Sequence, residues 1–349
     1  MIRGKITLIT GAAGFVGTNL ADRLLIAGER VRILDDLSRP GVERNLEWLE
    51  RRHGARLQVE VGDIGDRGLV ERALAGAQSV FHFAAQVAVT TSLDDPAHDV
   101  AVNLLATVNL LEAARNAPVM PRLVFTSTNK VYGDLADVAL RELGDRYEPV
   151  DRQLRRSGLS ESRPLDFCTP YGCSKGAADQ YVLDWHKSYG LPTAVFRMSC
   201  IYGPHQFGNE DQGWVAHFLI SAVADEPITI YGDGKQVRDI LFVEDLVDAL
   251  LAAREQMPAI AGRAFNIGGG PANAVSLRGV TAMIAELTGE EPELSFAPWR
   301  KGDQRWYVSD PRAFARATRW RPTVTPREGI GALHDWLVQE SARAVAGAA

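Results

Sequence analysis

Residues Lys5–Gly17 read Lys-Ile-Thr-Leu-Ile-Thr-Gly-Ala-Ala-Gly-Phe-Val-Gly, an apolar run that leads into three evenly spaced glycines. The β-branched and apolar residues before the glycines predict a buried strand, and Thr18–Ala27, which follows them, predicts a helix. In this context the first glycine permits a tight turn, the second a close approach of phosphate to the backbone, and the third close packing of helix on strand. The free N–H groups at the start of the helix favour anions. The stretch therefore predicts a nucleotide-binding loop, whose glycines are Gly11, Gly14 and Gly17.

The same alternation of strand and helix continues along the chain. Apolar runs that predict further strands occur at 30–34, 57–61, 79–85, 122–126 and 193–198. Strands that alternate with helices predict an α/β fold with a Rossmann-type, doubly wound parallel sheet. The change of character at Gly203-Pro204 marks a domain boundary. We expect an NAD-binding domain over 1–203 plus about 236–268, and a smaller mixed α/β substrate-binding domain over about 204–235 plus 269–349.

Acidic and small residues at the predicted strand ends indicate which dinucleotide binds. Asp35 and Asp36 end the second strand, about 20 residues after the glycines, where a carboxylate binds the ribose hydroxyls of the adenosine. A carboxylate there also repels a 2′-phosphate and so favours NAD over NADP, although an arginine such as Arg39 nearby can accept that phosphate. Two further groups are predicted to lie along the cofactor, the adenine edge Asp63-Ile64 and the small pair Ala84-Ala85.

Composition excludes several classes of partner. The chain has 349 residues, a net charge of −6 and a pI near 5.7, which argue against nucleic acid or an anionic membrane as the main partner. No apolar run is long enough for a membrane span. The glycine loop begins too early for a signal peptide, and the three cysteines have no metal-ligand spacing, so we expect a reduced, cytoplasmic protein without a metal site.

Three residues suit proton transfer beside a nicotinamide. Tyr171 and Lys175 lie four residues apart on one predicted helix, hence on one face, and Thr128 ends the fifth strand. A neighbouring ammonium favours the phenolate, so we expect Lys175 to lower the pKa of Tyr171 from its ordinary value of about 10. Tyr171 is then the base that takes a proton from a sugar hydroxyl, and Thr128 holds that hydroxyl.

Two longer stretches complete the prediction. The segment 99–116 predicts one helix with an apolar surface too wide for a single sheet face, which favours a homodimer through this helix and the helix that starts near Tyr171. The polar segment 134–169 is interpreted as a flap over the substrate.

Together these motifs resemble the extended short-chain dehydrogenase/reductases, the NAD-dependent epimerase/dehydratase family that acts on nucleotide sugars. The resemblance covers nearly the whole chain and also includes Val131-Tyr132-Gly133, Arg238-Asp239 and Arg300-x-Gly302-Asp303. It implies a nucleotide-diphosphate hexose substrate, with Arg238 and Arg300 on the diphosphate. The further cofactor-binding residues that it implies are Phe15, Val16, Ser38, Phe83, Asn103 and Met198. The further substrate-binding residues that it implies are Val87, Asn129, Lys130, Cys200, Gln206 and Gln212.

The two residues after Thr128 distinguish the dehydratases of this family from its epimerases. The 4,6-dehydratases carry Asp-Glu there, whereas Asn129-Lys130 supplies no carboxylic acid to expel water. The runs 127–133, 170–181 and 206–215 look like those of the CDP-paratose 2-epimerases, which implies inversion at C2 through a transient 2-keto sugar with tightly held NAD. Cys200 and His205 depart from the wider family, which usually carries Asn and Arg there. A UDP-hexose 4-epimerase is the alternative enzyme, and an inactive NAD-binding sensor is the alternative from another class.

Overall fold

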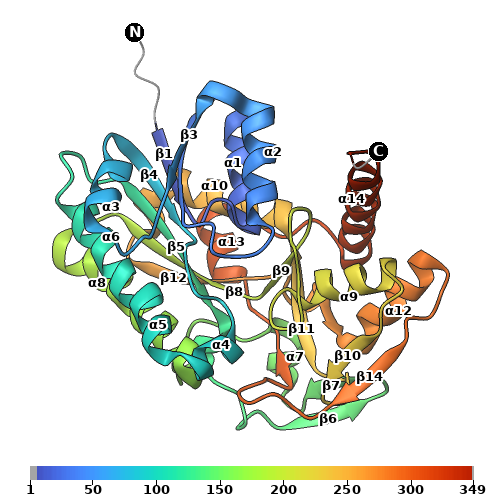
Figure 1. Ribbon diagram of the computed structural model, residues 1–349. Helices are drawn as coiled ribbons and strands as arrows, with labels where there is room; N and C mark the ends of the chain where they lie inside the picture. Colours follow the sequence, from blue (N-terminus) through green and yellow to red (C-terminus); the bar gives the residue numbers. More distant parts are fainter. Residues whose placement is uncertain (1–5, 348–349) are drawn as a thin grey trace.

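The computed structural model describes residues 6–347, so Lys5, the first residue of the predicted first strand, lies outside the described residues. Seven strands form one parallel sheet in the order β12-β8-β5-β4-β1-β2-β3, with helices on both faces (Figure 1). The predicted Rossmann-type, doubly wound fold is confirmed. The strands are β1 Ile6–Thr10, β2 Arg30–Asp35, β3 Leu57–Val61, β4 Ala77–His82, β5 Arg122–Thr128, β8 Thr193–Met198 and β12 Arg263–Ile267.

The sheet is covered on both faces, which is why its central strands are largely buried. Six of the seven residues of β5 are buried, and four of the five residues of β1. One face is covered by α1 Phe15–Ile26, α2 Val42–His53, α10 Val243–Glu255, α11 Met257–Ile260 and α13 Arg312–Thr318. The other is covered by α3 Arg67–Leu74, α6 Ala106–Arg115 and α8 Thr169–Tyr189. Helix α1 begins three residues before the predicted Thr18, directly after the extended residue Gly14.

The strand order changes direction between β1 and β4. From β1 the chain moves outward through β2 and β3, then returns to β4 on the other side and continues through β5, β8 and β12. In open parallel sheets ligands bind at this switch point, outside the carboxyl ends of the strands. Gly11 follows β1, Phe83 follows β4 and Thr128 ends β5, so the predicted cofactor and catalytic segments converge at one edge.

Residues 96–115 form one continuous helical run, which confirms the helix predicted over 99–116, but its middle turn is π-helical. It consists of α5 Pro96–Val100, a π-helical turn at Ala101–Leu105 and α6, preceded by the short helix α4 Val89–Asp94. A π-helical turn shifts the side chains that follow it around the helix axis, and such turns occur frequently at functional sites. This one places Asn103 inside the protein, where its side chain is 1% exposed.

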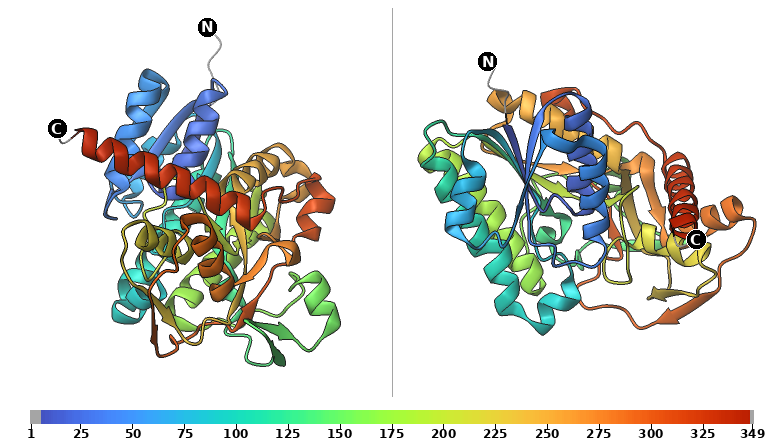
Figure 2. Two further views of the ribbon diagram at one scale, coloured as in Figure 1. Left: turned by 90° about the vertical axis from the view of Figure 1, so that its right-hand side faces the viewer. Right: turned by 45° about the horizontal axis from the view of Figure 1, so that its top comes forward.

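A second group of smaller sheets lies beyond the carboxyl ends of the large sheet (Figures 1 and 2). Strand β11 pairs with β13, β15 and β9, while β10 pairs with β14. These strands are β9 Cys200–Tyr202, β10 Ile228–Tyr231, β11 Val237–Phe242, β13 Ala274–Ser276, β14 Leu294–Ala297 and β15 Trp306–Tyr307. Helices α9 Trp214–Val223, α12 Leu277–Thr288 and α14 Pro326–Gly347 pack on them around a separate apolar cluster. The exact division into two domains stays a prediction, since β11 joins the smaller sheet and β12 the larger.

The segment 134–169 forms ordered structure. It contains a hairpin of β6 Leu140–Leu143 and β7 Arg146–Pro149, followed by α7 Arg152–Ser157. The hairpin is tied to the smaller part of the molecule, because Tyr147 donates its hydroxyl to Asp233 at 2.6 Å and its backbone N–H to Lys235. No residue of 134–169 lines the cavities described below, so its interpretation as a substrate flap is wrong. None of the helices within residues 6–347 combines the length and apolar character needed to cross a membrane.

Candidate active site

The glycine loop is shaped for close approach of a ligand and of its own helix. Gly11 has a φ of +67°, and a Cβ atom there would lie 2.6 Å from the backbone nitrogen of Ala84. A Cβ atom on Gly17 would lie 2.5 Å from the Cα atom of Ala12, so only glycine lets α1 start this close to β1. These constraints are the ones that the spacing of the glycines predicts, and they leave the N-terminus of α1 open to a ligand.

Asp35 ties the end of β2 to this loop. Its carboxylate accepts the backbone N–H of Ala13 at 2.9 Å and that of Leu37 at 2.9 Å. Asp36 instead turns toward Ser38 and accepts its hydroxyl at 2.7 Å. A cavity of about 470 Å³ lies beside these residues, and Arg39 also lines it. The predicted cofactor-binding residues in its wall are Gly11, Gly14, Asp35, Asp36, Ser38, Asp63, Ile64, Phe83, Ala84 and Ala85.

A second cavity, of about 330 Å³, holds the three predicted catalytic residues. Thr128 comes from the end of β5, while Tyr171 and Lys175 come from the first turns of α8. Lys175 is buried, with its Nζ atom 4.3 Å from the centre of the Phe125 ring. The other predicted residues in this wall are Gly11, Gly14, Phe15, Val16, Gly17, Phe83, Ala85, Val87, Asn129, Lys130, Met198, Cys200, Gln206 and Gln212.

Asn103 is the one predicted cofactor-binding residue that lines none of the three cavities described here. Its side-chain amide donates instead to Asp99 at 3.0 Å and to Ser174 at 3.1 Å. Asn103 thus points toward α8, where its partner Ser174 directly precedes Lys175.

The pKa values of the tyrosine and lysine differ from the expectation. Burial raises the pKa of Tyr171 to about 12, opposed by the Thr128 hydroxyl and reinforced by Asp99. Burial lowers the pKa of Lys175 to about 7, while Asp179 and Asp99 oppose this effect. The expected lowering of the Tyr171 pKa by Lys175 is therefore absent in the protein by itself, where burial of the phenol has the largest effect on that pKa.

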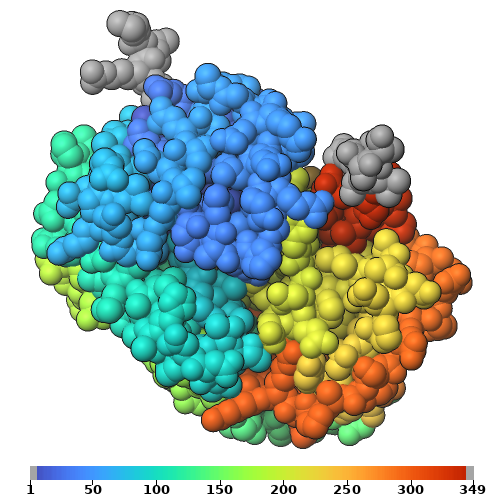
Figure 3. All heavy atoms as spheres, viewed as in Figure 1, coloured from blue at the N-terminus to red at the C-terminus, as the bar shows by residue number. Residues whose placement is uncertain are grey.

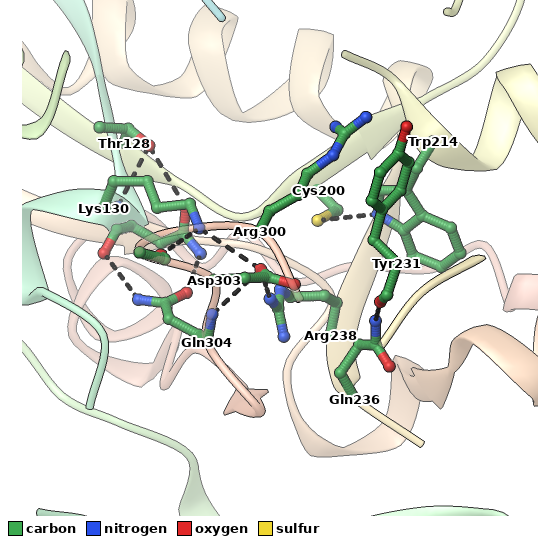
Figure 4. A network of polar contacts seen from close by, with 12 residues as sticks. Thr128, Lys130, Cys200, Trp214, Tyr231, Gln236, Arg238, Arg300, Asp303 and Gln304 are labelled. Carbon is green, nitrogen blue, oxygen red and sulfur yellow. Dashed lines mark hydrogen bonds and ion pairs between the residues drawn. The ribbon is translucent and has the colours of Figure 1, made fainter. Parts of the chain in front are cut away.

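A third cavity, of about 320 Å³, is lined by charged and aromatic residues from the smaller sheets (Figure 4). Arg238 donates to Asp303 at 2.7 Å, and Lys130 lies 3.6 Å from the same carboxylate oxygen. Although burial raises the pKa of Asp303, these two cations hold it below its ordinary value. Arg300 stacks on Tyr231, with its guanidinium carbon 3.7 Å from the ring centre.

Polar contacts connect this cavity to the catalytic residues. Asn129 donates to the Gln304 side chain at 3.0 Å, and Lys130 donates to the Gly302 carbonyl at 3.1 Å. The Trp214 indole donates to the Cys200 sulfur at 3.3 Å (Figure 4). Sequence reasoning named Asp303 and Trp214 only within longer motifs, and it missed Tyr231, Gln236 and Gln304. No local pattern singles these out, because they come from different elements of the smaller part.

The three cavities adjoin and form one trough. The first and second share Gly11, Phe83 and Val87, while the second and third share Lys130 and Cys200. In the space-filling view the N-terminal part (blue to teal) and the C-terminal part (yellow to orange) meet along the centre of the face (Figure 3). A larger cavity, of about 850 Å³, lies at the opposite edge of the sheet beside Arg30 and Arg67 and contains none of the predicted site residues. Within residues 6–347 no group of three acidic, His or Cys side chains is placed to hold a metal ion.

Comparison with known proteins identifies the family. The model of the NAD dependent epimerase/dehydratase family matches residues 7–268. The chain is 41% identical to the CDP-paratose 2-epimerase of Salmonella typhi over 336 residues, covering 94% of this chain and 98% of that protein. It is 35% identical to a UDP-glucose 4-epimerase of Mycolicibacterium smegmatis, covering 93% of this chain and 96% of that protein.

Comparison with solved structures supports the same family. A UDP-glucuronic acid 4-epimerase of Bacillus cereus, in complex with UDP-glucuronic acid and NAD, superposes with a TM-score of 0.82 at 27% identity, covering 96% of this chain and 99% of that one. The matched region contains the glycine loop, Asp35, Thr128, Tyr171 and Lys175. The chain therefore belongs to the NAD dependent epimerase/dehydratase family, and the resemblance recognised from its motifs is confirmed.

Proposed function

We propose that this enzyme is a nucleotide-sugar 2-epimerase of the CDP-paratose type, which inverts C2 by transient oxidation of the sugar and re-reduction. The observation that carries the proposal is the wall of the central cavity, which Thr128 and Tyr171 line together with Asn129 and Lys130. That wall offers a base and a hydroxyl partner but no carboxylic acid in the position from which dehydratases expel water. The 41% identity to a CDP-paratose 2-epimerase supports the same activity.

The trough suits a dinucleotide along its first two cavities. The backbone clearances at Gly11 and Gly17 leave room for a pyrophosphate, and Asp35 lies at the end of β2 where a ribose would be held. NAD, when bound there, supplies a reversible acceptor for the hydrogen on the sugar carbon. We assign cofactor binding to the residues predicted from the sequence, with Asn103 acting from beneath the cavity through Ser174.

Tyr171 is the proposed proton acceptor. Its hydroxyl takes the proton of the sugar hydroxyl as the carbonyl forms, and Thr128 holds that hydroxyl in place. A pKa of about 12 means that the phenol is mostly protonated in the cofactor-free protein. Positive charge brought into the cavity on binding favours the phenolate, so the base is formed where it is needed. Lys175, with a pKa near 7, contributes to this effect only while it is charged.

The third cavity is the proposed site of the nucleotide diphosphate. Arg238 and Arg300 present guanidinium groups, which bind phosphate oxygens in pairs. Asp303 neutralises Arg238 in the described structure, and the diphosphate would share that guanidinium with it. Val87, Cys200, Gln206 and Gln212 line the space between this cavity and Tyr171, where the hexose would lie.

A direct assay tests the substrate and the carbon. Purified enzyme is incubated with CDP-paratose, and separately with UDP-glucose, and the sugar configuration is read by NMR. We expect inversion at C2 of the CDP sugar, and no inversion in a Tyr171→Phe control. Inversion at C4 of UDP-glucose with CDP-paratose unchanged would establish the 4-epimerase instead. NAD in the purified protein with no turnover of either sugar would favour an inactive sensor.

We also propose a cytoplasmic homodimer. Support for the dimer comes from exposed apolar side chains on neighbouring helices, among them Val100 at 38%, Leu105 at 56% and Tyr181 at 43%. Support for the compartment comes from three free cysteines. Light scattering at micromolar concentration should give the dimer mass, and Leu105→Glu should give the monomer. A monomeric parent protein would contradict the proposal.

A further inference from the structure

We propose that the buried carboxylate of Asp99 is the counter-charge of Lys175, and that it positions the lysine ammonium through Ser174 and Asn103. The inference deepens the proposed function, because it names a residue outside the cavity that sets the charge of the site. Asp99 does not touch the cavity that holds Tyr171, so it is a positioning residue and not a catalytic one.

The proposal starts from Lys175, which is 3% exposed. Among the described residues no carboxylate oxygen lies within 4 Å of its nitrogen, which lies over the face of the Phe125 ring. A buried ammonium without a nearby opposite charge loses its proton. Two fully buried carboxylates are close enough for their charge to act on it, those of Asp99 and Asp179.

Asp179 is already paired. Its two carboxylate oxygens accept from Nε and Nη2 of Arg197, at 2.8 and 2.9 Å, in a bidentate contact buried beneath α8. Bidentate pairs of a guanidinium and a carboxylate are among the strongest charge-assisted hydrogen bonds in proteins. Asp179 favours the charged form of Lys175 more strongly than Asp99 does, but its carboxylate already has Arg197 as a bound cation.

Asp99 has only neutral partners. Ser174 donates its hydroxyl to one carboxylate oxygen, and Asn103 donates its amide to the other at 3.0 Å. Asn103 also donates to the Ser174 hydroxyl at 3.1 Å, which closes a triangle of three buried side chains. Ser174 precedes Lys175 directly on α8, so the triangle fixes the helix turn from which the lysine extends. Of the two carboxylates that favour charged Lys175, Asp99 is the one with no hydrogen-bonded cation of its own.

The other titratable groups around Lys175 do not supply the negative charge that Asp99 supplies. His82 hydrogen-bonds to Thr10 and Thr107, and burial with the nearby lysine lowers its pKa to about 3, so it is neutral. The exposed His98, when charged, lowers the pKa of Asp99, whereas burial raises that pKa most. Asp99 raises the pKa of Tyr171 as it raises that of Lys175. Cys173 on the same helix is neutral as a thiol, and burial, Cys168 and Asp99 all raise its pKa.

This arrangement predicts an unusual response to Asp99→Asn, which keeps the shape of the side chain and removes its charge. The pKa values of Tyr171 and Lys175 should both fall, by about one pH unit each. The two limbs of the pH–activity profile are set by the pKa values of Tyr171 and Lys175, so the whole profile should move to lower pH. A purely structural role for Asp99 would lower activity without moving either limb.

A second measurement needs neither substrate nor cofactor. The chain contains six lysines, so NMR of protein carrying ¹³C at the lysine ε-carbon can follow Lys175 alone, with Lys175→Arg to assign its signal. The Lys175 pKa of cofactor-free Asp99→Asn should lie about one unit below that of the parent. The matched control is Asp95→Asn, which removes the exposed carboxylate that caps the same helix and should leave the Lys175 pKa unchanged.

The outcomes separate the inference from the proposed function. An unchanged Lys175 pKa in Asp99→Asn, or an equal shift in Asp95→Asn, would overturn the inference whatever the substrate is. A shift in Asp99→Asn alone would support it even in a protein that epimerises no CDP sugar. If Asp99→Asn does not fold, Asp99→Ser, which is smaller and keeps one hydrogen-bonding oxygen, provides the same test.

Discussion

Replacing Gly17 by alanine tests the close packing on which the cofactor loop depends. A Cβ atom at Gly17 would lie 2.5 Å from Ala12 Cα, 2.7 Å from the Gly11 carbonyl oxygen and 2.9 Å from the Ala12 carbonyl carbon. All three neighbours are backbone atoms, so no side chain can rotate away and α1 itself must move. Overpacking of this kind costs about 1–3 kcal/mol of unfolding free energy. Alanine recovers about 1 kcal/mol through its higher helix propensity, which leaves a net loss of about 0–2 kcal/mol.

The displacement should also weaken NAD binding, because the N–H groups at the start of α1 move with the helix. NAD at about 100 times its dissociation constant stabilises the parent by about 2.7 kcal/mol. A tenfold loss of affinity would reduce this stabilisation by about 1.4 kcal/mol. Thermal unfolding of both proteins, with and without added NAD, measures the two effects separately.

Gly331 provides the matched control. It is also helical, in α14, but a Cβ atom there would meet nothing within 4 Å. Gly331→Ala should therefore raise the stability by up to about 1 kcal/mol and leave NAD binding unchanged. A Gly17→Ala protein as stable as the parent, with the same thermal shift on adding NAD, would refute the reasoning from backbone clearance.

Three further predictions concern the chemistry. Tyr171→Phe should lower turnover by about 10² to 10⁴ while the NAD content of the purified protein stays the same; activity within a few-fold of the parent would place the base elsewhere. Calorimetry should show tighter binding of NAD than of NADP, because the Asp35 carboxylate repels a 2′-phosphate, and a preference for NADP would assign Arg39 to that phosphate. A nucleotide hexose with deuterium at C2 should give the 2-epimer with its label retained in ordinary water, as measured by mass spectrometry. Loss of the label would instead indicate that Tyr171 removes the C2 proton itself.

Much of this protein follows from short stretches of its sequence. The spacing of Gly11, Gly14 and Gly17 after an apolar strand predicts both the fold and the position of the cofactor loop. The clearance at Gly17 is set by the neighbouring residues Gly11 and Ala12, whereas that at Gly11 is set by Phe83 and Ala84, which follow the neighbouring strand of the sheet. The strands at 57–61 and 193–198 are predicted to the residue. The run at 193–198 is almost wholly buried, whereas 57–61 alternates apolar and polar residues at the edge of the sheet. The family resemblance depends on the same local motifs and on the pair Tyr171 and Lys175.

Tertiary structure decided what depends on contacts between distant segments. The π-helical turn that buries Asn103 has no local signature, and neither has the hairpin that makes 134–169 part of the smaller half of the molecule. The pKa values of Tyr171 and Lys175 are set by burial, which four residues of one helix cannot reveal. Asp99 lies 75 residues before Ser174, and Asn129 lies 175 residues before Gln304. Such partners meet only when the sheet and its helices have packed, because a side chain's charge and hydrogen bonds are determined by whatever the fold places around it.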